Sequence, residues 1–154
     1  MIINWYSIDK SYVNYLKKYD KNVPNIDYTG RLKCFLGIII QINSIAYFAP
    51  LTSYKKKFDN MNNDIDFYKI IGKNRKVYGA ININNMIPVS KNEYLEITFE
   101  NLDELRIFKN KRDKKQYWKL LQTELSCINE EIILYNARRL YKYVQKYPNS
   151  ILAR

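Results

Sequence analysis

Short apolar runs separated by polar turns follow one another along the first two thirds of the chain, which is typical of a strand-rich fold. The β-branched run 34–42 predicts a buried strand. Asn43-Ser44 favours a tight turn into the apolar run 45–51, so the two runs predict a β-hairpin. A polar loop is expected at 53–64. Further strands or strand fragments are predicted at 2–8, 65–71, 78–84, 86–89 and 94–99.

Two segments show apolar residues at helical spacing instead. Residues 9–20 predict a first helix, with Ser7 or Asp9 as its N-cap. After Asp103, apolar residues recur at helical intervals as far as Pro148. We therefore expect an α+β fold. It combines a small, strongly bent antiparallel sheet wrapped into a barrel, a helix near the N-terminus and a helical C-terminal region.

Length and charge narrow the class of protein. The chain has 154 residues, which predicts one domain over 1–154 with a sizeable core. Its net charge is +11, and basic residues outnumber acidic ones in 1–60 and in 103–154 but not between them. An anionic partner gripped by both ends of the chain is expected. Fifteen tyrosines and two tryptophans fit stacking on unpaired bases, although an AT-rich genome also enriches tyrosine and lysine codons.

Several chemistries are excluded by the residues that are missing. The chain has no histidine and only four scattered glycines, which removes Ser-His-Asp hydrolysis, imidazole-based ribonuclease chemistry, His-rich metal sites and Gly-rich phosphate loops. The stretch 60–66 superficially resembles a calcium loop but lacks the turn glycine and the distal glutamate. No metal site and no cofactor are therefore predicted.

The two cysteines and the chain start bear on the compartment. Cys34 and Cys127 lie in apolar surroundings without CxxC spacing, which favours buried free thiols in a reducing compartment. The start lacks the pattern of a signal peptide, and the longest apolar run is too short to span a bilayer. We expect a cytoplasmic protein without a membrane partner.

The segment 48–58 holds the residues with the most chemical interest. It ends a predicted strand in Thr52 and Ser53 and then places three lysines at 55–57. Two hydroxyl donors beside positive charge suit a phosphate, whereas the alternative is a solvated turn. Such groups suffice to cleave RNA without a metal, because the ribose 2′-hydroxyl is the nucleophile and the protein only aligns it and neutralises developing charge.

Four stretches of the chain carry a resemblance to a known family. They are "SYVNYLKKYDKNVPN" (11–25), Lys33 with "FLGIII" (35–40), "YFAPLTSYKKK" (47–57) and "GAININNMIPV" (79–89). In order and spacing these stretches resemble the ToxN/AbiQ family, the toxins of type III toxin–antitoxin systems, including their CptN branch. "QYWKLLQTEL" (116–125) is a weaker match in the C-terminal third.

The resemblance implies a sequence-preferring endoribonuclease toxin of growth arrest and phage defence, with an SH3-like barrel similar to the MazF/Kid toxins. It also implies that the toxin trims, and is inhibited by, an antitoxin RNA built of pseudoknot repeats. The active site of the family corresponds here to Lys33, Thr52, Ser53 and Lys55. Lys57 stands where many relatives carry a tryptophan.

The predicted hairpin is compatible with that site, because the start of one hairpin strand and the end of the next are adjacent. Further RNA contacts are predicted at Tyr12, Tyr28, Lys56, Lys57, Lys111, Arg112, Lys114, Lys115, Tyr117 and Trp118. For the rings the alternative is packing, and for the segment 109–115 it is a solvated helix face. RNA that bridges protomers would give a protein–RNA oligomer. Two other functions stay open: a MazF-like toxin inhibited by a protein, and an RNA-binding module without catalysis.

Overall fold

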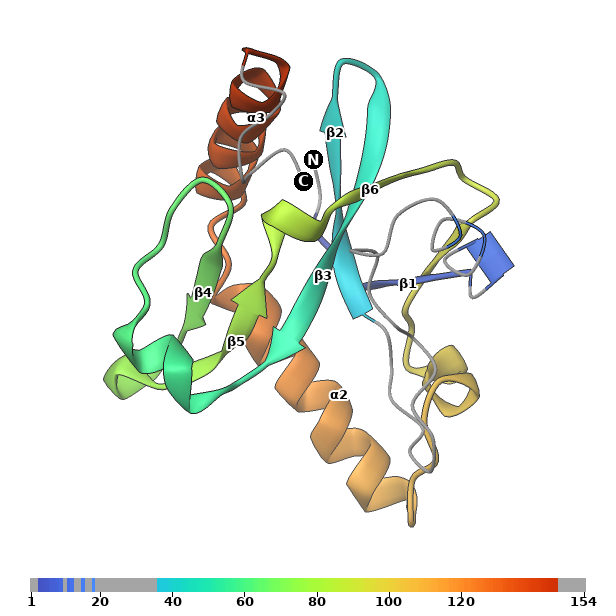
Figure 1. Ribbon diagram of the computed structural model, residues 1–154. Coiled ribbons are helices and arrows are strands. Elements are labelled where there is room, and N and C mark those ends of the chain that lie inside the picture. The colour runs from blue at the N-terminus through green and yellow to red at the C-terminus, as the bar shows by residue number, and fades with distance from the viewer. Residues whose placement is uncertain (1–2, 10, 13–14, 16–17, 19–35, 147–154) are drawn as a thin grey trace.

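The computed structural model describes residues 3–9, 11–12, 15, 18 and 36–146 of the chain. These residues form an α+β fold of seven strands, four short 3-10 helices and two α-helices (Figure 1). The strands are β1 (Tyr6–Ile8), β2 (Leu36–Ile42), β3 (Ile45–Ser53), β4 (Tyr68–Ile71), β5 (Val77–Ile81), β6 (Ile87–Val89) and β7 (Tyr94–Glu96). The helices are η1 (Lys56–Asn60), η2 (Lys73–Arg75), η3 (Ile83–Asn85), η4 (Glu100–Glu104), α2 (Lys111–Ser126) and α3 (Glu130–Lys146).

The predicted hairpin is confirmed. Strands β2 and β3 pair antiparallel from Gly37 opposite Pro50 to Ile42 opposite Ile45. Asn43 and Ser44 between them have φ angles of 51° and 69°. Two successive positive φ angles are what a two-residue primed turn requires, and such turns match the twist of the strands they join. The turn residues therefore fix the register of the longest strand pair in the sheet.

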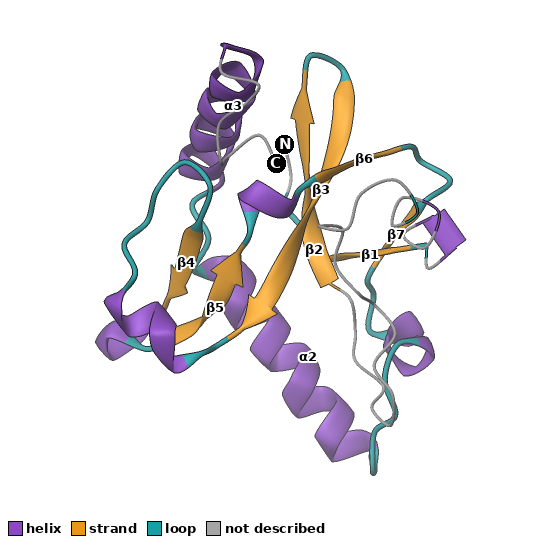
Figure 2. Ribbon diagram, viewed as in Figure 1, coloured by secondary structure: helices purple, strands orange, loops and turns teal. Residues whose placement is uncertain are grey.

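Strand β3 lies at the centre of the sheet, and two strands share the edge of β3 that does not pair with β2. β2 follows it along one edge, while β6 pairs with Ala46–Phe48 and β5 with Leu51–Ser53 on the other. The strand order is β4-β5-β3-β2-β1-β7, with β6 alongside β3. Figure 2 shows β4 and β5 on one side of the central hairpin and β1 and β7 on the other.

The sheet does not close, so the prediction of a barrel is wrong in this respect. Among the described residues, β4 and β7 each have only one neighbouring strand and lie at opposite ends of the strand order. They are four and three residues long. No pairing joins β4 to β7 in the described part of the chain, so the ladder of hydrogen bonds does not run around a closed barrel.

Most predicted strands exist but are shorter than expected. The segment 2–8 is a strand only at Tyr6–Ile8, and 78–84 leaves the sheet after Ile81 to form η3. The segment 53–64 is not a simple polar loop, because it contains η1. Phe58 on η1 is 2% exposed and packs edge-on against Phe67, with ring centroids 5.3 Å apart. With Met61, which packs against the same cluster, Phe58 anchors a segment whose remaining residues are mostly polar.

The helical C-terminal region is confirmed as two helices. The side chain of Asn110 caps α2 by accepting a hydrogen bond from Asp113 N at 2.8 Å. A short turn between α2 and α3 spans residues 127–129, where Asn129 N donates to the Tyr68 hydroxyl at 2.9 Å. This bond ties the interhelical turn to β4. Cys127 is half-buried with a free thiol, whereas Cys34 lies outside the described residues.

The predicted N-terminal helix at 9–20 falls largely outside the described residues. Ser11, Tyr12 and Tyr15 are helical, and the Asp9 carboxylate accepts hydrogen bonds from Ser11 N at 2.8 Å and Ser11 Oγ at 2.6 Å. An aspartate that accepts from the backbone amide two positions further on has the geometry of the predicted N-cap. The rest of the helix stays a prediction.

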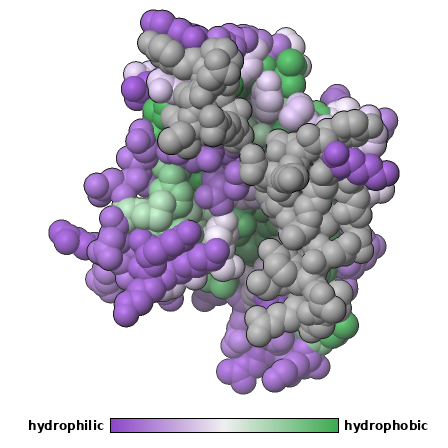
Figure 3. All heavy atoms as spheres, viewed as in Figure 1, coloured by the Kyte–Doolittle hydropathy of each residue, from purple (hydrophilic) through white to green (hydrophobic). Residues whose placement is uncertain are grey.

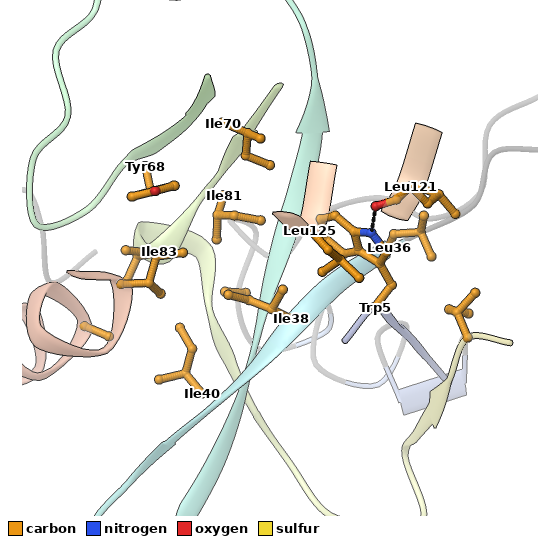
Figure 4. Packing of buried hydrophobic residues seen from close by; sticks show 14 of the residues in the cluster. Trp5, Leu36, Ile38, Ile40, Tyr68, Ile70, Ile81, Ile83, Leu121 and Leu125 are labelled. Atoms are coloured by element: carbon orange, nitrogen blue, oxygen red, sulfur yellow. Dashed lines mark hydrogen bonds between the residues drawn. The ribbon is translucent and has the colours of Figure 1, made fainter. Parts of the chain in front are cut away.

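One apolar core lies between the sheet and the two helices. Isoleucines of β2, β4 and β5 meet leucines of α2 and apolar residues of α3 (Figure 4). Trp5 is 1% exposed, and its indole N–H donates to Leu121 O at 2.8 Å, as the dashed line in Figure 4 shows. A buried indole with its polar atom satisfied stabilises the contact between the N-terminal segment and α2. Within the described ranges, no helix has the length and apolar character needed to cross a membrane.

Glu124 on α2 is a buried carboxyl in this core. Its side chain is 6% exposed, and Oε2 has no hydrogen-bond partner among the described residues. Burial raises the pKa of Glu124 from 4.5 to about 7. Below pH 4.5 the carboxyl is protonated in both the folded and the unfolded chain. Between the two pKa values only the unfolded chain ionises, so the free energy of unfolding falls as the pH rises.

Glu124→Gln is therefore expected to stabilise the protein at neutral pH and above. A difference of this size in pKa corresponds to about 3 kcal/mol, which glutamine avoids because it carries no ionisable group. Denaturant unfolding of both proteins from pH 4 to pH 8 measures the effect. Glu104→Gln, at an exposed site, is the matched control. Parallel pH profiles for wild type and Glu124→Gln would show that Glu124 does not carry this dependence.

Candidate active site

Thr52 and Ser53 are the last two residues of β3 and not the start of a turn. Strand β3 runs two residues further than predicted, and Thr52 pairs with Ala80 while Ser53 pairs with Gly79 on β5. Gly79 permits this pairing at close range, because a Cβ built there would lie 2.4 Å from the backbone oxygen of Thr52. Any larger side chain would push β5 away from the strand end that carries the two hydroxyls.

The two hydroxyls lie on opposite faces of the sheet, because neighbouring strand residues point in opposite directions. Thr52 shares a row and a face with Ala80 on β5 and Lys69 on β4. Ser53 belongs to the next row, with Gly79 and Ile70. A phosphate that contacts both hydroxyls therefore has to lie off the end of β3, in the direction of Lys55.

Asn82 holds the Thr52 side chain in place. Its amide Nδ2 donates a hydrogen bond to Thr52 Oγ1, and its backbone N donates to Pro50 O at 2.9 Å. A threonine oxygen that accepts from an amide still has its own O–H available as a donor. Thirty positions separate the two residues in the chain, so only the β3–β5 pairing brings them together. The sequence motif at 79–89 contains Asn82 but gives no sign of this contact.

The three lysines begin at the residue before η1 and continue into it. Lys55, Lys56 and Lys57 are all exposed, and the Lys55 carbonyl accepts from Phe58 N at 2.8 Å. Directly before them, the Tyr54 hydroxyl donates to Asp59 Oδ2 at 2.6 Å, a bond that raises the pKa of this tyrosine. The buried Phe58 ring and the Tyr54–Asp59 bond thus fix the backbone of a positively charged turn.

Lys69 is a cation near this turn that the sequence did not single out. It lies in the same row as Thr52, with Ala80 between them, and its Nζ donates to Phe58 O at 3.1 Å. It is partly buried between β4 and η1. The apolar run 65–71 predicted the strand, but no sequence signal distinguishes Lys69 from an ordinary solvated lysine.

Lys33 and Tyr28 lie outside the described residues. Described β2 begins at Leu36, and its first pair with β3 is Gly37 opposite Pro50. The expected approach of Lys33 to Thr52 and Lys55 therefore stays a prediction.

The aromatic candidates pack against the fold. The Tyr12 hydroxyl donates to Pro88 O, and its ring joins the cluster around Phe48 and Val89. Burial, followed by the charge of Glu93, raises the pKa of the Tyr12 phenol. Tyr117 and Trp118 are both half-buried against the main core. These contacts account for the three rings as packing residues.

The basic segment 109–115 begins α2, and its members differ in their surroundings. Lys111, Arg112 and Lys115 are exposed. Lys114 is half-buried, forms an ion pair with Asp103 at 2.6 Å and lies 4.3 Å from the centre of the Phe99 ring. The first three side chains are thus available to a phosphate backbone, whereas Lys114 already has an anionic partner.

Metal ligands do not gather anywhere in the described part of the chain, where no group of three or more His, Cys, Asp or Glu side chains is found. The chemical capacity of the site thus rests on hydroxyls, amides and lysines. These groups bind phosphate oxygens and neutralise the charge that develops on them.

Two bacterial proteins named endoribonucleases have sequences similar to this chain. The endoribonuclease ToxN of Pectobacterium atrosepticum is 33% identical over 106 residues, which are 65% of this chain and 61% of that protein. The endoribonuclease AbiQ of Lactococcus lactis subsp. lactis is 25% identical over 158 residues, 96% of this chain and 82% of that protein. The chain therefore matches about three fifths of the length of the Pectobacterium relative.

A solved structure has the same fold. It comes from work on a bacterial type III toxin–antitoxin system in which a non-coding RNA pseudoknot selectively inhibits the toxin. The TM-score is 0.73 at 26% identity, over 94% of this chain and 80% of that one. The family model for the toxin ToxN of type III toxin–antitoxin systems matches residues 4–153, so this chain belongs to the ToxN family.

Proposed function

We propose that this protein is a metal-independent endoribonuclease toxin that is inhibited by a structured antitoxin RNA. Membership in the ToxN family carries this proposal, and the relatives are endoribonucleases by name. The site at the end of β3 supports it, because a held threonine hydroxyl, an exposed serine and a lysine turn lie in succession there. The substrates are cellular RNA and the precursor of the antitoxin RNA.

In the proposed mechanism the nucleophile comes from the RNA, and the protein supplies donors, cations and a base. The RNA 2′-hydroxyl attacks the adjacent phosphorus, the bond to the 5′-oxygen breaks, and a 2′,3′-cyclic phosphate and a 5′-hydroxyl result. Thr52 and Ser53 donate to oxygens of this phosphate, with Asn82 orienting Thr52. Lys33 and Lys55 neutralise the charge that develops on the phosphate, and one of them, as the neutral amine, accepts the 2′-proton. The leaving 5′-oxygen takes a proton from water and becomes the 5′-hydroxyl.

We propose in addition a fold relationship, a cellular compartment and an oligomeric assembly. The open sheet with β3 at its centre is related to the SH3-like architecture of the MazF/Kid toxins, and the segment 9–20 completes the N-terminal helix. The protein acts in the cytoplasm, where its RNA substrates are. An antitoxin RNA unit that contacts two protomers closes a protein–RNA oligomer, since head-to-tail contacts that complete a rotation form rings.

RNA cleavage is expected to continue unchanged in excess EDTA. The reaction needs alignment of an internal nucleophile and charge stabilisation, and lysines and hydroxyls supply both. Incubation of a defined RNA with the purified toxin, with and without chelator, measures the rate. Mass spectrometry of the fragments should show a 2′,3′-cyclic phosphate. Cleavage that stops in EDTA and returns with magnesium would contradict the proposed chemistry.

The two other functions predict different results in the same assays. A non-catalytic RNA-binding module would bind the RNA and leave it intact. A toxin inhibited by a protein would keep its activity when the antitoxin RNA is added. Co-expression of the toxin with the RNA encoded beside it, followed by sequencing of the RNA that co-purifies, separates these cases.

A further inference from the structure

A pocket of about 360 Å³ lies beside the candidate active site and is not used by the proposed chemistry. It is formed by the segment between η1 and β4 together with η3. Its lining consists of Met61, Asn62, Asp64, Asp66, Phe67, Asn82, Asn84 and Asn85. The volume is within the range of small-molecule sites. Hydrophilic residues dominate the part of the surface over η1 and the segment that follows it, at lower left in Figure 3.

Backbone hydrogen bonds hold the pocket wall in shape. Asp64 and Phe67 exchange two bonds, of 3.0 Å and 3.3 Å, and Asn84 N donates to Asp66 O at 3.0 Å. The bond between Asn84 and Asp66 fixes η3 against the segment before β4. The wall is thus preformed, which lowers the entropic cost of binding a ligand.

The polar side chains of the lining are largely unused by the protein. Those of Asn62, Asp66, Asn84 and Asn85 form no hydrogen bond with any described residue. Amides offer both donors and acceptors, and carboxylates offer acceptors only. Met61 and Phe67 contribute apolar surface to the same lining. This lining of six polar and two apolar side chains is suited to a flat heterocycle, whose edge can form hydrogen bonds while its face lies against Met61 and Phe67.

The charge of the lining argues against a phosphate inside the pocket. Two carboxylates and no basic side chain line it, whereas the exposed lysines lie on η1 beyond its rim. Asn82 belongs to both sites, because it lines the pocket and its amide donates to Thr52 Oγ1. An RNA whose phosphate lies at Thr52 therefore has a neighbouring base within reach of the pocket.

We propose that this pocket binds a nucleobase next to the scissile phosphate and selects one that carries an exocyclic amino group. Unstacked RNA bases are recognised by hydrogen bonds on their edges, and a carboxylate accepts from an amino group. Uracil has no amino group to donate to the carboxylates of Asp64 and Asp66, so it should bind more weakly than the other bases. This inference rests on the proposed function for its position in the reaction, but the binding of a base is testable by itself.

The binding test uses the ¹⁵N-labelled full chain with Lys55→Ala, which keeps the protein from cleaving RNA during expression. AMP, CMP, GMP, UMP and ribose 5-phosphate are titrated while the asparagine side-chain NH₂ signals are followed. We expect the signals of Asn62, Asn84 and Asn85 to move with at least one amino-bearing nucleotide at concentrations about tenfold lower than with UMP. Ribose 5-phosphate should leave them unmoved. The inference is overturned if no nucleotide moves them, if ribose 5-phosphate moves them equally, or if UMP moves them at the same concentrations as the amino-bearing nucleotides.

The cleavage test compares wild type with Asp66→Asn and Asn84→Ala on a randomised RNA library. The wild type should prefer an amino-bearing base at one position fixed relative to the cut, and each variant should lose about tenfold of that preference. Asn92→Ala, on an exposed turn outside the lining, is the matched control and should keep it. Unchanged preferences in the two pocket variants would refute the inference while the endoribonuclease proposal stands. If the wild type binds nucleotides but cleaves no RNA, the endoribonuclease proposal is refuted and the base-binding pocket is not.

Discussion

Alanine at Ser53 or at Lys55 is expected to lower the rate of RNA cleavage by about a hundredfold or more. The loss of one preorganised donor to a developing oxyanion typically costs this much, because no water replaces it in the same geometry. Ser53 is exposed at the last position of β3, and Lys55 is exposed at the residue before η1. Neither side chain contributes to the core, so the free energy of unfolding should change little.

Single-turnover cleavage of a defined RNA and growth arrest on expression both measure this loss. Lys91→Ala serves as the matched control, since it also removes an exposed lysine but lies in the turn between β6 and β7. Thr52→Val adds a further comparison, because it removes the hydroxyl that Asn82 orients and keeps the shape of the side chain. If a folded protein with both alanines still cleaves RNA at the wild-type rate, the end of β3 is structural only.

The parts of the fold that the sequence predicts are those fixed by short-range chemistry. Asn43 and Ser44 adopt positive φ at low cost compared with β-branched residues, and they joined two apolar runs. That combination predicted the hairpin correctly. The spacing of Leu121, Leu125 and Ile133 likewise predicted helices whose apolar face is buried. Each prediction depended on neighbours within a few residues.

The features that were missed depend on long-range pairing. Whether β4 and β7 close a barrel is decided by how β3 divides its far edge between β5 and β6, and periodicity carries no information on that. The contact between Thr52 and Asn82 arises in the same way. The site residues were identified by the resemblance to a known family, because periodicity does not reveal them. One of them, Lys33, lies outside the described residues.

Composition gave a weaker signal for the aromatic residues. Rings beside cations suggested base stacking, yet the Arg106 guanidinium lies 4.3 Å from the centre of the Tyr117 ring and Trp118 packs edge-on against Phe99. The same pairing of cation and ring therefore stabilises the fold. A sequence shows that such groups are near one another in the chain but not whether they face the core or a ligand.

The exposed residues Lys111, Arg112 and Lys115 are expected to supply much of the salt dependence of antitoxin RNA binding. Each phosphate that a protein neutralises releases condensed counterions, so the logarithm of the affinity falls linearly with the logarithm of the salt concentration. Replacing all three by alanine should reduce this slope by roughly two to three units. Figure 1 shows the start of α2 at the bottom of the molecule, apart from the end of β3, so an RNA that contacts both has to extend across the protein.

Lys114→Ala is the matched control within the same segment. Its Nζ already pairs with Asp103 at 2.6 Å and lies over the Phe99 ring, so it releases fewer counterions when RNA binds. The slope should therefore change by less than one third of the change in the triple variant. Binding of the processed antitoxin RNA, measured by fluorescence anisotropy between low and physiological salt, gives all three slopes. Slopes that coincide for the wild type and the triple variant would place the RNA on another surface of the toxin.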